Sequence, residues 1–326
     1  WLIRRYVDWF NGICLKHPVV IPLLLTCKRC ANKVTNKRQW QVVARKKRMQ
    51  ALENLAVGQF EKVAGGLYLE GLAVAPDGTT VWTSDVIAGG IRRHNAAGGV
   101  AALNPQRLWT GGLLFDQRGA IFSTGQGGIL RTEPATSQSS WLIDAIDGQP
   151  INGINEMAPD GVGGLFFGTV DLDAIIKGEK PGPACIYRIA ADGALHLAHG
   201  PLGFANGMAL SADGRTLFLN ESFDGTYAFD VQPDFSLANR RKLLSKEDCD
   251  GMALDVEGNL WITGFRSSDI TRMMPDGTLL SPFATPASAI TQIRFGGADM
   301  RVERTKGDEV TDRADLHVDY EQQADQ

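Results

Sequence analysis

Four polar residues occupy the same place in four copies of a repeated pattern. Glu70, Asn155, Asn206 and Asp250 each stand two residues ahead of a short apolar run that leads to an Asp-Gly or Glu-Gly turn, and three of the four are followed by Gly. Two carboxylates and two amide oxygens at one point would form an all-oxygen site for a hard divalent cation, since Ca²⁺ accepts about six to eight oxygens with loose geometry. The competing interpretation is that each residue caps a turn, as Asn and Asp often do. Four positions in equivalent register favour the metal site.

The repeated pattern also predicts the elements that must hold these residues. Each copy has an apolar strand, a tight turn with Gly at a positive-φ position and a second strand, which together make a β-hairpin. Further Asp-Gly turns between the copies give about four strands per repeat, with a period of about 40 to 50 residues, which is typical of a β-propeller. The copies lie at 72–84, 113–124, 157–169, 208–220, 252–264 and 293–303.

Six copies predict an all-β fold, a six-bladed β-propeller with a central metal site. The innermost strand of each blade lines the central channel of a propeller, so the four polar residues would meet at its entrance. A parallel α/β sheet would need helical runs of about ten residues between strands. The nearest candidate for such a run, 171–180, is short and reads as a loop or a single helical turn.

Charge and cysteine content narrow the function classes. The net charge is −4, because the positive charge of the N-terminal region is balanced by an acidic body. An acidic body lacks the basic face that phosphate contacts need, so we expect no nucleic-acid partner. No apolar run approaches the roughly 18 residues of a membrane span, so we expect no membrane partner. The five cysteines are odd in number and loosely spaced, which argues against a disulfide framework and indicates a reducing, cytoplasmic location.

The two ends of the chain differ from its body. Residues 1–48 are rich in Lys and Arg, contain a short apolar run at 18–25 and a lone Cys27-x-x-Cys30 pair, and are expected to form a basic extension outside the fold. We expect the propeller to span 49–303 and a polar, acidic tail to follow at 304–326. Because the tail has little strand pattern, the last blade is predicted to be incomplete, unless the N-terminal region fills the gap or the chain is an altered copy.

The motifs LEGLAVAPDG, FANGMALSADGRTLF and DCDGMALDVEGNLW resemble those of the SMP-30/gluconolactonase/luciferin-regenerating-enzyme family over about residues 58 to 300. Members of that family are six-bladed propellers with one divalent metal in the central tunnel. The resemblance implies that Glu70, Asn206 and Asp250 are metal ligands and that Asn155 is a fourth ligand or a substrate contact. It further implies that Asp250 is the catalytic acid or base, and that the metal is Ca²⁺, with Zn²⁺ or another divalent ion as alternatives.

The sequence departs from the family pattern near the substrate. Sugar-lactone members place an Arg two residues before the Asn that matches Asn155, whereas this chain has Gly153. A substrate-binding carboxylate of the family aligns with Asp173. The missing Arg puts aldonolactones specifically in doubt as substrates.

Together these observations predict a metal-dependent hydrolase of lactones or related small esters. The cation would polarise the carbonyl of a small-molecule substrate, and Asp250 would act as general base or nucleophile. Phe167, Phe223 and Phe265 either wall the pocket or belong to the core. No GxSxG elbow, Walker motif or dinucleotide-binding glycine motif occurs in context. Three alternatives stay open: a non-catalytic calcium-binding propeller scaffold, a phosphotriesterase-like hydrolase with similar ligands, and a non-functional fragment.

Overall fold

The computed structural model describes residues 20–23, 65–78, 80–94, 100–296, 303–304 and 310–311. The fold over these residues is nearly all β, and one short helix, α3 (Leu172–Lys177), interrupts it. Most of the predicted basic extension and acidic tail, including the Cys27 and Cys30 pair, lies outside the described residues. Among the residues that the structure describes, no helical segment has the length and apolar character needed to cross a bilayer.

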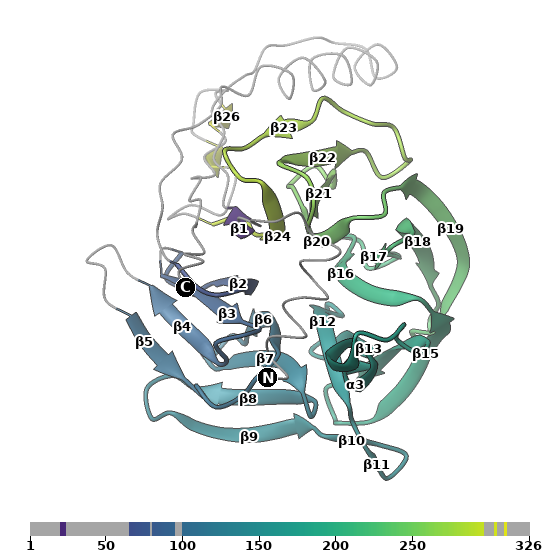
Figure 1. Cartoon of the computed structure of the whole chain (residues 1–326). Coiled ribbons are helices and arrows are strands. Elements are labelled where there is room, and N and C mark those ends of the chain that lie inside the picture. Colours follow the sequence, from purple (N-terminus) through teal and green to yellow (C-terminus); the bar gives the residue numbers. More distant parts are fainter. Residues whose placement is uncertain are drawn as a thin grey trace.

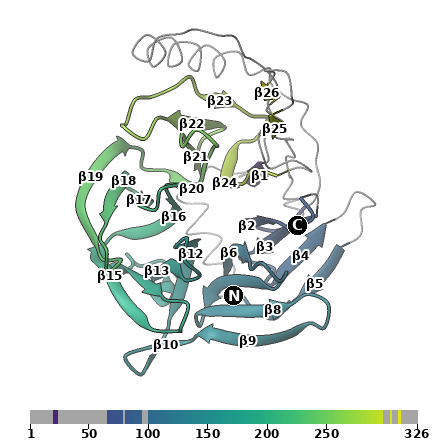
Figure 2. The same cartoon turned by 180° about the vertical axis from the view of Figure 1, so that it is seen from behind.

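The described strands form five four-stranded antiparallel units, arranged around a common centre (Figures 1 and 2). In each unit the chain runs from the innermost strand outward, and consecutive strands pair. The units are β2 (Leu69–Val74), β3 (Val81–Asp85), β4 (Ile91–His94) and β5 (Val100–Leu103); β6 (Thr110–Phe115), β7 (Ile121–Gln126), β8 (Ile129–Glu133) and β9 (Gln138–Ile143); β12 (Gly153–Pro159), β13 (Leu165–Val170), β14 (Ala184–Ile189) and β15 (Leu195–Leu202); β16 (Phe204–Leu210), β17 (Thr216–Ser222), β18 (Gly225–Val231) and β19 (Leu237–Ser245); and β20 (Cys249–Leu254), β21 (Leu260–Gly264), β22 (Asp269–Met273) and β23 (Phe283–Ala284).

The predicted turn chemistry is confirmed within these units. Seven glycines of the expected turns adopt φ values between 71° and 89°, which residues with a Cβ rarely adopt. They are Gly78, Gly119, Gly161, Gly193, Gly214, Gly258 and Gly277. The expected turn at Asp224-Gly225 differs, because Gly225 begins β18 and Phe223 has the positive φ there. A small hairpin of β10 (Ala145–Ile146) and β11 (Gln149–Pro150) links the second and third units, and these units also pair directly through β7 and β12.

Apolar side chains pack between neighbouring units and leave the polar residues at the centre. The largest cluster joins the third and fourth units through Phe166, Ile186, Leu219 and Phe229, all fully buried. Close packing between the faces of adjacent sheets holds the innermost strands in fixed positions relative to one another.

A further strand, β24 (Ala289–Ile293), lies between the fifth unit and the first. The Thr291 hydroxyl donates a hydrogen bond to the backbone oxygen of Leu69 in β2 (2.8 Å), and the Thr263 hydroxyl of β21 donates one to the backbone oxygen of Thr291 (3.1 Å). The short strand β1 (Val20–Leu23) pairs with β24 in parallel. A separate two-stranded ribbon joins β25 (Glu303–Arg304) to β26 (Val310–Thr311). The described strands thus surround the centre on all sides.

Candidate metal centre

A β-bulge sits at the same place in the innermost strand of all five units. At this place the inner strand advances three residues while its partner advances two, so one inner residue has no direct partner. Bulges of this kind redirect side chains, and they are common beside functional sites. We call the first residue inside each bulge a ring position. We use the same name for Thr291 of β24. The ring positions are Glu70, Gly111, Asn155, Asn206, Asp250 and Thr291.

Side chains of the second strands hold the bulges in place. A bulge frees backbone groups from the ladder, and a buried carbonyl without a partner is costly. Here the second strand of one unit donates a side-chain hydrogen bond to the carbonyl of the next unit's ring position. The bonds are Ser84 Oγ to Gly111 O (2.6 Å), Thr124 Oγ1 to Asn155 O (2.6 Å), Asn220 Nδ2 to Asp250 O (2.7 Å) and Thr263 Oγ1 to Thr291 O (3.1 Å).

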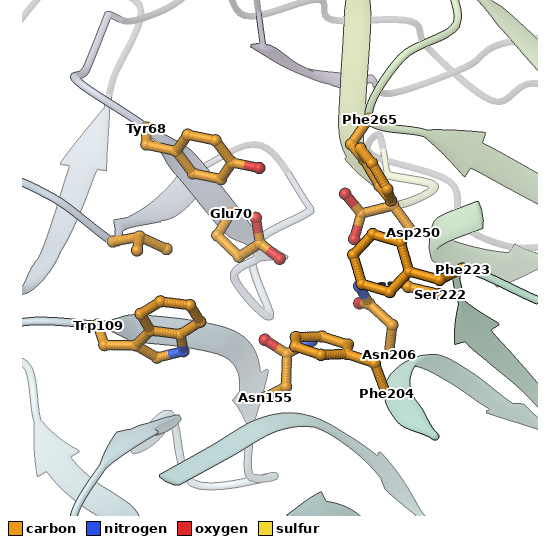
Figure 3. Close-up of a pocket in the computed structure, with 11 residues that line it drawn as sticks. Tyr68, Glu70, Trp109, Asn155, Phe204, Asn206, Ser222, Phe223, Asp250 and Phe265 are labelled. Carbon is orange, nitrogen blue, oxygen red and sulfur yellow. Dashed lines mark hydrogen bonds between the residues drawn. The ribbon is translucent and has the colours of Figure 1, made fainter. Parts of the chain in front are cut away.

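The structure brings the four residues predicted from the sequence into one cavity. Glu70, Asn155, Asn206 and Asp250 all line it, and each is at least nine-tenths buried. Figure 3 shows the carboxylates of Glu70 and Asp250 pointing into the same space as the two amides. The cavity volume is about 30 Å³, which is enough for a water or a small ion. The remaining lining residues are Tyr68, Val86, Trp109, Phe204, Ser222, Phe223 and Phe265.

Three oxygen atoms facing this cavity lack a hydrogen-bond partner. They are Oε2 of Glu70, Oδ1 of Asn206 and Oδ1 of Asp250. The orientation of Asn206 is fixed, because its Nδ2 donates to Ser222 Oγ (3.1 Å), whose hydroxyl donates to the backbone oxygen of Cys249 (2.7 Å). Buried oxygens are rarely left unpaired, so three of them in one cavity fit a ligand that binds oxygen lone pairs, such as a cation or a hydrogen-bond donor.

The electrostatics of the two carboxylates lead to the same conclusion. Burial, with the charges of Asp250 and Glu156, raises the pKa of Glu70 well above its ordinary value. Burial also raises the pKa of Asp250, although a hydrogen bond from Asn206 opposes the shift. A divalent cation between these groups would remove that penalty, because it favours both ionised forms. Within the described residues no three His, Cys, Asp or Glu side chains cluster, so the amide oxygens are essential to this donor set. An all-oxygen donor set suits Ca²⁺.

A second buried polar layer crosses the centre next to the ring positions, and the sequence analysis did not identify it. Four ring positions are followed by Gly, but Asn155 is followed by Glu156 and Thr291 by Gln292. Gln292 Nε2 donates to Glu156 Oε1 (2.8 Å) although 136 residues separate them, and Arg294 Nη2 lies 3.7 Å from Glu156 Oε2. The glycines make room: a Cβ on Gly112 would lie 2.7 Å from the Glu156 carboxyl carbon. The signal was present in the sequence as two exceptions to the Gly pattern.

The residues predicted to contact substrate have different locations. Asp173 lies on α3 with an exposed side chain and is not among the residues that line the cavity. Phe223 and Phe265 line the cavity, whereas Phe167 is fully buried in the core and stacks on Tyr187 (5.8 Å). Gly153 begins β12, where a Cβ would lie 3.0 Å from Val170 Cγ1. The substrate roles of Asn155 and Asp173 stay predictions.

Comparison with known proteins relates this geometry to a family. Residues 69–302 match the SMP-30/Gluconolactonase/LRE-like region. Pentonolactonase XacC of Haloferax volcanii is 24% identical over 239 residues, which cover 71% of this chain and 78% of that protein. Regucalcin of Danio rerio is 30% identical over 176 residues, or 50% of this chain and 56% of that protein, so the chain spans just over half the length of this relative.

Solved structures show the same fold at lower identity. A luciferin-regenerating enzyme superposes with a TM-score of 0.64 at 18% identity, covering 78% of this chain and 92% of that one. A gluconolactonase from Xanthomonas campestris, XC5397, superposes with a TM-score of 0.63 at 22% identity, covering 77% of this chain and 86% of that one. The family match spans more than half of the sequence and includes all four predicted ligands. The chain therefore belongs to the SMP-30/gluconolactonase/LRE-like family.

Proposed function

We propose that the protein is a metal-dependent hydrolase of lactones or related small esters, with one Ca²⁺ held by Glu70, Asn155, Asn206 and Asp250. The observation that carries this proposal is the set of three buried oxygens that face one cavity without a partner. The names of two relatives, pentonolactonase XacC and the Zymomonas mobilis gluconolactonase, support lactones as the substrate class. Zn²⁺ or another divalent ion is the alternative occupant.

The same proposal includes the architecture, a six-bladed β-propeller in which β24 is the innermost strand of the sixth blade. Two observations support this place for β24. Its Thr291 is linked to both neighbouring units in the manner of the other ring positions, and Gln292 follows it into the second polar layer. The pairing of β1 with β24 supports the view that N-terminal residues help to complete this blade.

Each residue of the site has a role in the proposed reaction. A bound cation would supply Lewis-acid polarisation of the substrate carbonyl. Glu70 and Asn206 would hold the ion, because their unpaired oxygens face it. Asp250 would accept the proton of the attacking water at its carboxylate, or attack the carbonyl carbon itself. Asn155 would either complete the ligand set or donate its amide N–H to the substrate.

A scaffold that binds calcium without catalysis fits the same unpaired oxygens, and one relative of known structure is described as a calcium-binding protein, regucalcin. Catalysis is the observation that separates the two functions. If the protein binds Ca²⁺ and gains stability but hydrolyses no lactone or ester, the scaffold function replaces the hydrolase.

The test is lactone hydrolysis by the purified full chain, followed through acid release, with EDTA and then with Ca²⁺, Zn²⁺ or Mn²⁺ added back. We expect activity to disappear with EDTA, to return with metal and to be absent in Asp250→Asn. Asp192→Asn is the matched control, because Asp192 is an exposed turn carboxylate. Hydrolysis that is insensitive to EDTA, or equal in Asp250→Asn and wild type, would refute the proposed mechanism.

A further inference from the structure

Five aromatic side chains line the mouth of the cavity. Figure 3 shows Tyr68 and Trp109 on one side of the opening and Phe204, Phe223 and Phe265 on the other. We call these five residues the aromatic wall. Apart from the four predicted metal ligands, the polar groups of the lining residues are the Tyr68 hydroxyl, the Trp109 indole N–H and the Ser222 hydroxyl. Ser222 already bonds to Asn206 and to the backbone of Cys249, and the three Phe residues bring no polar atoms to their side of the cavity.

Three of these residues have the same place in the sequence repeat. Tyr68, Trp109 and Phe204 each precede a ring position by two residues. Tyr68 and Trp109 lie just before β2 and β6, and Trp109 has a φ of 50°, so strand alternation does not set the direction of its ring. Figure 3 shows the three rings around the same opening as Glu70 and Asn206. Gly153 is the corresponding residue of the third unit and contributes no side chain at all. In the fifth unit Asp248 has this place, and its carboxylate accepts hydrogen bonds from Lys246 and Ser267 (both 2.7 Å).

Contacts between rings make one side of the wall continuous. The Phe204 and Phe223 ring centroids are 6.1 Å apart with planes at 86°, and the Phe223 and Phe265 centroids are 5.7 Å apart at 63°. Edge-to-face packing of this kind orders the rings without filling the opening. Phe223 is the central ring of the three, and 43% of its surface is exposed. The Phe223 ring thus offers an apolar surface to a ligand, whereas the neighbouring Phe265 is 5% exposed.

The backbone at two wall residues has an uncommon conformation. Phe223 has a φ of 72° and Trp109 a φ of 50°, in the left-handed region that bulky residues rarely occupy. Trp109 also packs with Tyr68 and Val86 in a buried cluster. Phe235, which does not line the cavity, has a φ of 66°, so a positive φ alone does not mark the wall. Phe223 differs from both, because it lines the cavity and 43% of its surface is exposed.

We propose that the site is specific for lactones and esters that carry an apolar alkyl or aryl substituent, and that it discriminates against polyhydroxylated sugar lactones. This inference rests on the proposed hydrolase function. The substituent would lie against Phe204, Phe223 and Phe265 while the carbonyl faces Glu70 and Asp250. Sugar hydroxyl groups would lose water against these three Phe rings without gaining partners there, which costs binding energy. In the reaction, water adds across the acyl C–O bond, and a lactone gives the hydroxy acid and, on ionisation, one proton.

The experiment compares two lactones with the same six-membered ring. δ-Decalactone carries a pentyl chain, and δ-gluconolactone carries hydroxyl groups. We expect kcat/KM of the Ca²⁺-loaded wild type, corrected for spontaneous hydrolysis, to be at least about tenfold higher for δ-decalactone, since even one methylene in an apolar pocket contributes about tenfold or more. In Phe223→Asn the ratio of the two kcat/KM values should fall by about tenfold.

Phe235→Asn is the matched control for this variant. Phe235 also has a positive φ (66°), and it packs on Arg188 and on Phe166 of the core, outside the residues that line the cavity. Asn adopts the left-handed region more readily than Phe, so both variants keep a favourable backbone. We expect Phe235→Asn to leave the substrate ratio unchanged.

The outcomes separate this inference from the proposed function. Metal-dependent hydrolysis that favours δ-gluconolactone, or a ratio that Phe223→Asn does not change, overturns the aromatic-wall specificity and leaves the hydrolase function standing. A folded, Ca²⁺-loaded wild type that hydrolyses neither lactone and no ester overturns both. A ratio that falls equally in Phe223→Asn and Phe235→Asn assigns the effect to general loosening of the fold and also overturns the inference.

Discussion

Arg294→Met should destabilise the protein far more than an ordinary surface substitution, because it leaves a buried carboxylate without its cation. Glu156 is 1% exposed, and burial raises its pKa while the charge of Arg294 lowers it. Arg294 lies 3.7 Å from this carboxylate and also donates to the backbone oxygens of Met252 (3.2 Å) and Ile293 (2.8 Å). The substitution thus removes the charge partner, one link to β20 at Met252 and one local bond within the β24 segment at Ile293.

The size of the effect follows from these contacts. Breaking a buried ion pair from one side costs about 3–5 kcal/mol. Glu156 can take up a proton instead of staying charged, which limits the loss, and Gln292 still donates to it. We therefore expect the free energy of unfolding to fall by about 3 kcal/mol. The double variant Glu156→Gln/Arg294→Met removes the unpaired charge, so it should recover at least about 1 kcal/mol relative to Arg294→Met.

Urea unfolding followed by fluorescence and circular dichroism measures these values. Arg131→Met is the control, because Arg131 pairs with Asp116 (3.3 Å) and Glu133 (2.7 Å) on the surface, where an ion pair contributes about 0–1 kcal/mol. Two outcomes would contradict this prediction: a free energy of unfolding that falls no more in Arg294→Met than in Arg131→Met, or a double variant that is no more stable than Arg294→Met. Either result would show that the second polar layer does not hold β24 to the third unit.

Three other predictions concern the metal, pH and the ring. Ca²⁺ at about a hundredfold excess over its Kd should add about 2.7 kcal/mol to the free energy of unfolding of the wild type, and clearly less in Glu70→Gln; equal gains would contradict the ligand role. Burial and Arg92 lower the pKa of His94 from 6.5 to about 4, so folding favours the neutral ring. Stability from this group is present above pH 6.5 and is lost as pH falls toward 4. Urea unfolding should show about 2 kcal/mol less loss between pH 7 and 4.5 in His94→Gln than in wild type. Gly111→Ala should lower the free energy of unfolding by about 2 kcal/mol, because the new Cβ would lie 2.5 Å from the backbone oxygen of Asn155. An unaltered urea midpoint would refute this prediction.

The hairpins could be predicted from the sequence because their signals are local. Asp-Gly and Glu-Gly between apolar runs specify a turn whatever the rest of the chain does, and Gly78, Gly214 and Gly258 have the φ values that such turns require. The sixth copy of the pattern, at 293–303, pointed to this part of the chain, but β24 ends where that copy begins. Its place beside β2 depends on contact with Leu69, more than 200 residues away, which the local pattern does not contain.

The candidate site was predictable to the extent that it repeats. Glu70 and Asp250 share a register with the two Asn residues, and the structure brings all four to one cavity. The expectation for Phe167 could not be settled in the same way. Side chains alternate between the faces of a strand, and only the packing of neighbouring units shows which face is core. Asp173 depended on an alignment across a loop, and its exposed location on α3 shows how little loop position constrains a side chain.

The hydrogen bonds that hold the bulges have a consequence for how the site can change. Each bond is made to the backbone carbonyl of a ring position and does not involve its side chain, so the same frame carries Gly, Asn, Asp or Thr. Donor atoms are therefore interchangeable without rebuilding the scaffold. Placing His at Asn155 or Asn206 would add nitrogen donors and shift the preference of the centre from Ca²⁺ toward Zn²⁺. Because the backbone at the ring positions is held independently of the side chains, substitutions there could be used to design sites for other metals.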